Sequence, residues 1–248
     1  MIAPFLLSSN RGARVPRWHG FRQFPDVARD RKAVPHAETE PTETFLPRTR
    51  TLPALRKAAA GCRGCPLYLR ATQTVFGEGL PDARAVLVGE QQGDAEDKKG
   101  RPFVGPAGRI LDKALAAAGI DRDSVYVTNA VKHFTFEERG KARIHKKPRG
   151  SDVKACKPWL AAELDVVKPD VVVLLGATAA QSLMGPSFRV TQERGKPILS
   201  GVAPVVVATT HPSAVLRAPD EDARNEAFRA LVADLAVVAG ELKKRSSR

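Results

Sequence analysis

The strongest constraint on the fold is an unbroken apolar run of five residues, Val-Val-Val-Leu-Leu, at positions 171–175. Such a run, rich in β-branched side chains, predicts a strand that is covered on both faces. Similar short runs occur at 84–89, 124–130 and 204–209, and helical patterns separate them. Strands that alternate with helices pair in parallel, with helices on both faces of the sheet. We therefore expect an α/β fold: a three-layer αβα sandwich with a central four-stranded parallel sheet.

Start and stop signals support the helices around these strands. Pro53 favours a helix start before Leu55 and Ala59, and Gly119 and Pro169 favour helix ends. The later helices are expected at 106–118, 151–167, 177–184 and 221–238, with a polar loop at 133–150.

The first 50 residues are rich in arginine and proline and show little periodicity. Such a composition predicts a disordered basic extension at 1–50. The folded domain is therefore expected at 51–242, followed by a basic tail at 243–248.

The chain carries 40 lysines and arginines against 27 aspartates and glutamates, a net charge of +13. This excess favours a polyanionic partner, most often nucleic acid; a basic protein without such a partner is the alternative. No apolar stretch of about 18 residues occurs, so no membrane span is expected. The apolar run at the N-terminus has no charged residue before it and makes a poor secretory signal, so we expect a cytoplasmic protein.

The three cysteines form a Cys62-x-x-Cys65 pair and a distant Cys156. An odd number leaves one cysteine outside any disulfide framework, and a C-x-x-C pair suits a metal or redox site in a reducing compartment. His133, after the second strand, is the natural fourth ligand. Imidazole can replace thiolate at an iron–sulfur centre, and a Cys₃His zinc site fits the same spacing. Buried inert thiols and a surface histidine are the alternatives.

Polar side chains follow three of the predicted strands. Glu90 and Gln91 come directly after the first, Asn129 ends the second, and His211 follows the last. The carboxyl ends of parallel strands meet at one edge of the sheet, where α/β folds bind ligands. The glycines of the first turn lack the dinucleotide-binding spacing, so a tight turn is the alternative there.

The segment after the first strand combines carboxylates with a single aromatic residue. Asp94 lies near Glu90, and acidic groups beside a phosphate-binding surface suggest chemistry rather than a phosphate grip. Phe103 stands between glycines and prolines, so it can stack on a flat base or fill the core. Together these residues predict a nucleobase pocket.

The basic loop at 139–149 contains one histidine among several cations. Lys141, Arg143 and Lys146 are candidate DNA contacts, with a solvated charge run as the alternative. Nearby positive charges disfavour protonation of His145, so it is expected to stay neutral near pH 7 and to act as a nucleophile or base. Further candidate DNA contacts, after the last strand, are Ser213 and Arg217, with a structural turn as the alternative.

Taken together, these motifs resemble the family 4 uracil-DNA glycosylases, and most closely their UdgX-like branch. The resemblance covers residues from about 55 to 240 and leaves out the N-terminal extension. The matching segments are Cys62-Arg-Gly-Cys65, Gly89-Glu-Gln-Gln-Gly-Asp94, Gly100-Arg-Pro-Phe-Val-Gly-Pro-Ala-Gly108, Thr128-Asn-Ala-Val-Lys-His133, Lys141-Ala-Arg-Ile-His145, Ala155-Cys-Lys-Pro-Trp159, Leu175-Gly-Ala-Thr-Ala-Ala180 and His211-Pro-Ser213.

The resemblance implies a uracil-DNA glycosylase fold with a 4Fe–4S cluster, acting as a monomer on uracil-containing DNA. The cluster ligands would be Cys62, Cys65, His133 and Cys156. Ordinary family 4 members have cysteine where this chain has His133, and histidine there is the UdgX-like pattern.

The resemblance also assigns the pocket. Phe103 would stack on uracil, Asn129 would bond its edge, and His211 would stabilise charge on the departing base. The expected uracil contacts are Gly89, Gln91, Asp94, Phe103, Asn129 and His211. The expected catalytic residues are His145, Glu90, His211 and Gln91.

UdgX-like proteins capture the sugar after base removal through the histidine that matches His145. We therefore expect uracil excision, with single strands preferred because the base must leave the stack. His145 would then attack C1′ while Glu90 removes the other imidazole proton, so that one protein processes one uracil. A conventional turnover glycosylase and a non-catalytic, metal-stapled DNA-binding module are the alternatives.

Two positions depart from the branch pattern. Gln92 stands where proline is usual, so the turn is expected to be less rigid. Ala142 stands where arginine is usual, which removes one cation from the loop. We expect weaker DNA contact from the second change, with the chemistry retained.

Overall fold

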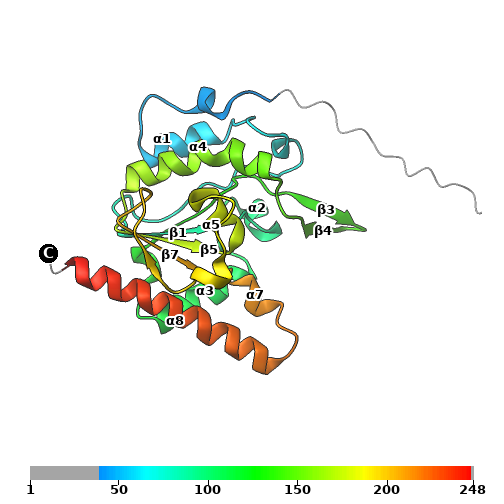
Figure 1. Ribbon diagram of the computed structural model, residues 1–248. Helices are drawn as coiled ribbons and strands as arrows, with labels where there is room; N and C mark the ends of the chain where they lie inside the picture. Colours follow the sequence, from blue (N-terminus) through cyan, green and yellow to red (C-terminus); the bar gives the residue numbers. More distant parts are fainter. Residues whose placement is uncertain (1–38, 247–248) are drawn as a thin grey trace, which may run out of the picture. The chain divides into compact units, whose positions relative to one another are not determined.

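The computed structural model describes residues 39–246, so the predictions for residues 1–38 and 247–248 lie outside the described residues. The main sheet has five strands in the order β2-β1-β5-β7-β6. Figure 1 labels three of them, β1, β5 and β7. The parallel strands of the sheet are β1 (Ala85–Gly89), β2 (Tyr126–Asn129), β5 (Val171–Leu175) and β7 (Val205–Thr209), and β6 (Pro197–Ile198) is antiparallel. The predicted four parallel strands are confirmed, and a short antiparallel strand is added at one edge.

Helices connect these strands. They are α1 (Leu52–Ala59), α2 (Asp94–Lys99), α3 (Pro106–Ala117), α4 (Gly150–Val167), α5 (Ala177–Met184), α6 (Val190–Glu193), α7 (Ser213–Leu216) and α8 (Glu221–Ser246). Short 3-10 helices lie at η1 (Thr42–Phe45), η2 (Pro66–Leu69) and η3 (Arg122–Ser124). The predicted start of α1 is confirmed: Thr51 Oγ1 accepts a hydrogen bond from the Ala54 N–H at 3.4 Å.

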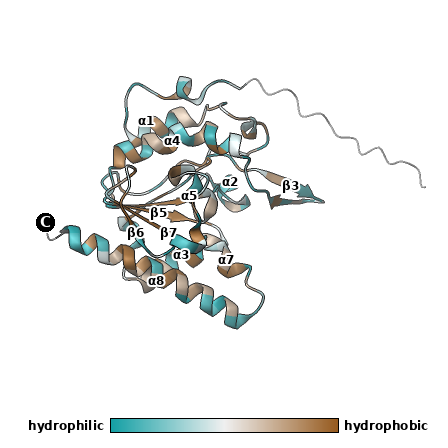
Figure 2. Ribbon diagram, in the orientation of Figure 1, coloured by the Kyte–Doolittle hydropathy of each residue, from teal (hydrophilic) through white to brown (hydrophobic). Residues whose placement is uncertain are grey.

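The parallel strands send alternate side chains to opposite faces of the sheet. Val86, Val172 and Val206 pack in one apolar cluster with α1, α4 and α5. Leu87 and Val173 pack in a second cluster with α3 and α8. The central strands are largely apolar (Figure 2). Because helices cover both faces, the domain is the predicted three-layer αβα sandwich.

The segment predicted as a polar loop contains an antiparallel hairpin instead. Its strands are β3 (Phe136–Arg139) and β4 (Ala142–His145), with Phe136 opposite His145. Most of its side chains are polar and exposed. The alternation that marks a half-buried strand is therefore missing, which is why the sequence prediction was wrong here.

The ends of the domain also differ from the predicted boundaries. Residues 42–45 form η1, in which Thr42 is buried and Phe45 packs against the core beside α4. The folded part thus includes residues before position 51. Residues 243–246, predicted as a tail, continue α8.

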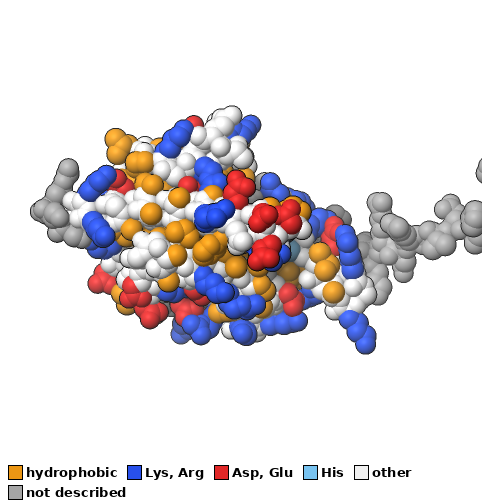
Figure 3. All heavy atoms as spheres, turned by 90° about the horizontal axis from the view of Figure 1, so that it is seen from below, with side chains coloured by type: hydrophobic (Ala, Val, Ile, Leu, Met, Phe, Trp, Pro, Cys, Tyr) orange, Lys and Arg blue, Asp and Glu red, His pale blue; other side chains and the backbone are white. Residues whose placement is uncertain are grey.

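On the face that Figure 3 shows, lysine and arginine side chains are interspersed with acidic and apolar ones. The net charge of +13 is therefore not concentrated in a single basic patch on that face. None of the helices within residues 39–246 has both the length and the apolar character needed to cross a membrane.

Candidate active site

A cavity of about 920 Å³ lies where the carboxyl ends of the parallel strands meet. Glu90 and Gln91 enter it after β1, Asn129 at the end of β2, and Gly176 and His211 after β5 and β7. The strand ends therefore bring these groups together, as expected. Other predicted site residues that line the cavity are Asp94, Phe103, His145, Ser213 and Arg217.

Gly89 allows close packing behind this cavity. A Cβ atom at position 89 would lie 2.3 Å from Asn129 Oδ1 and 2.7 Å from the Phe103 ring. Phe103 has a left-handed φ of 55°. Backbone strain of this kind costs about 1–3 kcal/mol and is common at ligand sites. Gly89 thus lets an aromatic ring and an amide lie side by side.

Asn129 presents an unsatisfied acceptor to the cavity. Its side chain is 3% exposed, and Oδ1 has no hydrogen-bond partner within the described residues. The backbone carbonyl of Asn129 accepts a hydrogen bond from Lys132 Nζ at 2.8 Å, and Lys132 forms a buried ion pair with Glu163. A buried acceptor without a partner costs about 1–3 kcal/mol. A donor group from a ligand or from a water molecule would satisfy this oxygen.

The protonation of His211 is set by its neighbours. The Ser213 N–H donates to His211 Nδ1 at 3.2 Å, and Ser213 Oγ lies 2.7 Å from the same nitrogen. Because Arg217 donates to that Oγ at 2.9 Å, the hydroxyl hydrogen is directed to Nδ1. Burial, with smaller effects of Arg217 and His145, lowers the pKa of His211 to about 4. The ring is therefore neutral near pH 7, with its proton on Nε2.

His145 ends β4 at the cavity wall. Its Nε2 atom lies 2.9 Å from Gln91 Nε2 and 3.4 Å from Glu90 Oε1. Partial burial lowers the pKa of His145, Glu90 opposes this shift, and Arg217 adds to it. The ring is neutral near pH 7, as expected. The main cause is desolvation, whereas the sequence had suggested the cations of its own loop.

The two residues after β1 also hold other groups. Gln91 Oε1 accepts from the Thr135 N–H at 3.0 Å, and Gln91 Nε2 donates to the carbonyls of Thr135 and Lys146 at 3.2 and 2.8 Å. The Glu90 carboxylate accepts a hydrogen bond from Thr178 Oγ1. Glu90 was expected to take the proton of the second imidazole nitrogen. Its Oε1 atom lies beside Nε2, the nitrogen that also faces Gln91, so Glu90 can take a ring proton only if Nδ1 attacks the sugar.

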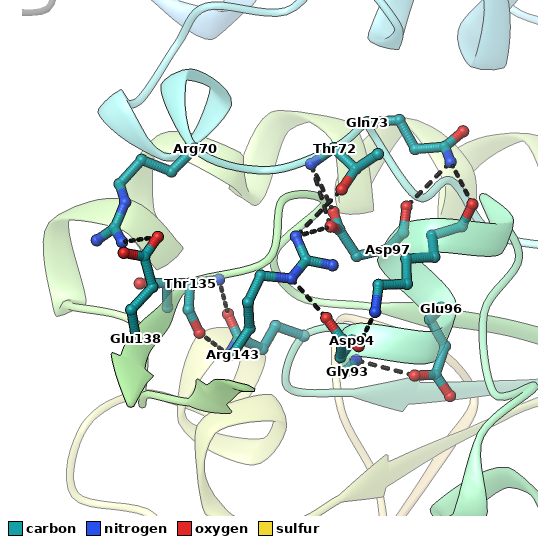
Figure 4. Close-up of polar contacts among 12 residues, drawn as sticks. Arg70, Thr72, Gln73, Gly93, Asp94, Glu96, Asp97, Thr135, Glu138 and Arg143 are labelled. Atoms are coloured by element: carbon teal, nitrogen blue, oxygen red, sulfur yellow. Dashed lines mark hydrogen bonds and ion pairs between the residues drawn. The ribbon is translucent and has the colours of Figure 1, made fainter. Parts of the chain in front are cut away.

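Arg143 fastens the hairpin to α2 (Figure 4). Its guanidinium donates to Asp94 Oδ1 at 2.5 Å, to Asp97 Oδ2 at 2.8 Å and to Thr72 Oγ1 at 3.1 Å. It also packs over the Phe136 ring, and its side chain is only 19% exposed. The structure therefore engages Arg143 inside the protein, where the sequence suggested a DNA contact. Asp94, expected to contact uracil, is one of its two carboxylate partners.

The four predicted metal ligands are all buried, at 5–8% exposure: Cys62, Cys65, His133 and Cys156. Cys62 Sγ accepts a hydrogen bond from Trp159 Nε1, and Cys156 Sγ accepts one from the Lys132 N–H, both at 3.2 Å. The thiols lie close enough to affect one another's titration. Burial raises the pKa of Cys65 to about 11 and that of Cys156 to about 12.

The hydrogen bonds of His133 define its tautomer. The Thr74 hydroxyl donates to the Ala59 carbonyl at 3.0 Å, so His133 Nε2, 2.9 Å from the same oxygen, is the donor in that contact. Nδ1 is then the nitrogen with a lone pair. A metal-binding histidine commonly donates its other N–H in this way. Within residues 39–246, no three histidine, cysteine, aspartate or glutamate side chains converge closely enough to hold one metal ion.

Residues 76–236 match the sequence profile of the Uracil DNA glycosylase superfamily. The chain belongs to this superfamily. The matched range contains all five strands of the main sheet and the hairpin. The α/β architecture expected for a uracil-DNA glycosylase is thereby confirmed.

Several curated relatives carry the name type-4 uracil-DNA glycosylase. The protein from Thermotoga maritima is 39% identical over 184 residues, which cover 74% of this chain and 90% of that protein. The protein from Sulfurisphaera tokodaii is 34% identical over 178 residues, covering 68% and 78%. The protein from Pyrobaculum aerophilum is 34% identical over 175 residues, covering 68% and 86%.

Leu216 also lines the cavity and was not singled out from the sequence, and Lys147 of the basic loop lines it as well. Leu216 is 42% exposed and lies next to Arg217. Leu216 follows the predicted site residues His211 and Ser213 and precedes Arg217. This position could have indicated from the sequence that Leu216 belongs to the site.

The candidate DNA contacts in the hairpin do not line the cavity. Lys141 lies in the exposed turn between β3 and β4. Lys146 Nζ pairs with Glu137 at 2.9 Å. Contact of either lysine with DNA stays a prediction.

Proposed function

We propose that this uracil-DNA glycosylase superfamily member excises uracil from DNA and then retains the abasic sugar covalently on His145. The superfamily match and the type-4 relatives support the excision. The retention rests on one observation: a neutral imidazole at the cavity wall, 3.4 Å from the Glu90 carboxylate.

Asn129 would distinguish uracil from cytosine through its unpaired acceptor. Uracil N3–H can donate to Asn129 Oδ1, whereas the unprotonated N3 of cytosine would face the lone pairs of that oxygen. A site built around a hydrogen bond rejects a ligand that leaves its buried group unpaired. The Phe103 ring, 6.3 Å from the His211 ring, offers a flat apolar surface to the extruded base.

His211 would stabilise the leaving base. Cleavage of the N-glycosidic bond produces an oxocarbenium-like sugar and a uracil anion. The Nε2–H of neutral His211 donates to a carbonyl oxygen of that anion. A preorganised donor in such a position is worth about 3 kcal/mol of barrier.

His145 would then take the place of water. The Nε2 lone pair forms a bond to C1′ and the ring becomes cationic. The Nδ1 proton leaves to solvent, and the uracil anion takes a proton from water. Glu90 places a negative charge beside the sugar and the ring while each is cationic. Because the ring is held at the site, its effective concentration is high, and the neutral adduct has a poor leaving group.

Adduct formation is expected to depend on pH through His145. Only the neutral ring has the attacking lone pair, and burial lowers its pKa below the usual value. The rate should therefore fall as the pH decreases, with its midpoint below the usual histidine value of about 6.5. The measurement is the single-turnover rate of adduct formation at pH values between about 5 and 8. A rate that is already halved near pH 7 would contradict the neutral ring.

Leu216→Ala is expected to slow uracil release from double-stranded DNA more than from single strands. An exposed apolar side chain at the cavity mouth can fill the gap that an extruded base leaves in a duplex. We expect about a tenfold loss on duplex DNA and less than about a twofold loss on single strands. Leu199→Ala, at a position that is 85% exposed and does not line the cavity, is the control. Equal losses of the release rate on both substrates would show that Leu216 has only a structural role within the protein.

We further propose that the three cysteines and His133 hold an iron–sulfur cluster. The buried sulfurs that accept N–H groups and the lone pair on His133 Nδ1 fit this role. A single zinc ion needs its ligands to converge, and none of the described residues do so. A cluster presents separate irons to separate ligands. When bound, the group would supply cross-links between chain segments, with no part in the glycosidic step.

The test incubates the protein with single-stranded uracil DNA and separates the products on a denaturing gel after heat and SDS. We expect released uracil and a slow band that contains protein and DNA. Free abasic DNA alone would indicate a turnover glycosylase, the activity that the relatives' names describe. Equal capture of thymine DNA would overturn the uracil assignment. Binding without base release would leave only a DNA-binding module.

A further inference from the structure

Gln92 has a buried side chain whose amide has no hydrogen-bond partner within the described residues. The residue is 1% exposed, and both Oε1 and Nε2 are unpaired. It lines the same cavity as Asn129. Buried amide groups in folded proteins nearly always have partners, because leaving both donor and acceptor unpaired is strongly unfavourable. The missing partner is therefore expected to occupy the cavity.

The neighbouring Gln91 shows how a structural glutamine behaves in this turn. Its amide oxygen accepts from one backbone N–H, and its nitrogen donates to two carbonyls. Among residues 39–245, the uncharged side-chain atoms that are buried without a partner belong to Gln92 and Asn129 alone, and both residues line the cavity. The other buried atoms without a hydrogen bond are guanidinium nitrogens, and one of them, Arg194 Nη2, lies 2.8 Å from the Asp234 carboxylate. The two residues that carry unpaired amide atoms therefore both line one cavity.

We propose that Gln92 is a specificity-determining residue that hydrogen-bonds the base in this cavity. The inference rests on the proposed uracil excision. Asn129 Oδ1 is an acceptor and suits the ring N3–H of uracil. Gln92 Nε2 is a donor and suits one of the two carbonyl oxygens that flank N3–H. The two amides together match the alternating donor and acceptor edge of an imide.

The experiment compares the wild type with Gln92→Met, which keeps the length of the side chain and removes its amide. Free uracil is expected to raise the melting temperature of the wild type and to raise that of the variant much less. Uracil release from single-stranded DNA in a single turnover should slow about tenfold. Without ligand, the variant should melt at the same or a higher temperature, because an unpaired buried amide has been removed.

Three further variants complete the comparison. Gln92→Glu cannot donate and places a charge against a carbonyl oxygen, so uracil release should slow by about a hundredfold. Gln192→Met makes the same replacement at an exposed glutamine outside the cavity and should match the wild type. Gln92→Leu repeats the test if the methionine variant does not fold.

If Gln92→Met releases and binds uracil as well as the wild type does, Gln92 has no role in base recognition. The proposed uracil excision would be unaffected. A lowered melting temperature with unchanged uracil release would likewise make the amide a structural group and reject the proposal. If the wild type itself releases no uracil, the proposed function fails and the role of Gln92 falls with it.

Discussion

A His145→Ser protein is expected to release uracil from single-stranded DNA and to leave no band that survives heat and SDS. Serine lacks the imidazole lone pair, and its hydroxyl is a weak nucleophile. Water then attacks the sugar, so abasic DNA accumulates in place of the adduct. The measurement is the fraction of labelled DNA in the slow band, with uracil release followed in the same samples.

The matched control is Ile144→Ser, one residue earlier on β4. Ile144 is 42% exposed, so the change leaves the hairpin and the cavity intact. This protein should form the adduct at nearly the wild-type rate. An adduct that persists in His145→Ser would require another nucleophile and would refute the assignment.

A His211→Ala protein is expected to release uracil about 10²–10³-fold more slowly. The change removes the Nε2–H that would stabilise the uracil anion. Because capture follows base loss, adduct formation should slow by the same factor. The pKa of His211 is lowered to about 4, so the neutral ring acts throughout and the loss should be constant between about pH 6 and pH 8. Single-turnover uracil release measures it.

Ser213→Ala provides the graded comparison. This change keeps the ring and removes the hydroxyl that directs its tautomer, while the Ser213 N–H remains. We expect a loss of about tenfold. If His211→Ala releases uracil at nearly the wild-type rate, His211 does not stabilise the leaving base.

The parallel strands could be predicted because each is a short buried run that needs no distant partner to be recognised. The run at 171–175 is buried at every position. Once the strands are placed, topology alone brings Glu90, Asn129 and His211 to one edge. This part of the site follows from chain order and the rule for parallel sheets.

The β3–β4 hairpin and the contacts that hold it against α2 could not be predicted in the same way. Its strands pair through the backbone, and Arg143, which a charge count assigns to DNA, ties β4 to α2. Only the fold places Asp94 and Asp97 against Arg143. The unpaired amide of Gln92 was equally hidden, because a lack of partners is a property of the packed interior.

The most direct test of the account identifies the protein atom that holds the sugar. The adduct with single-stranded uracil DNA is digested with protease and nuclease, and the cross-linked peptide is sequenced by tandem mass spectrometry. We expect a deoxyribose remnant on His145, on a peptide from the β3–β4 hairpin. A remnant on any other residue, or the recovery of unmodified His145 peptide alone, would contradict it.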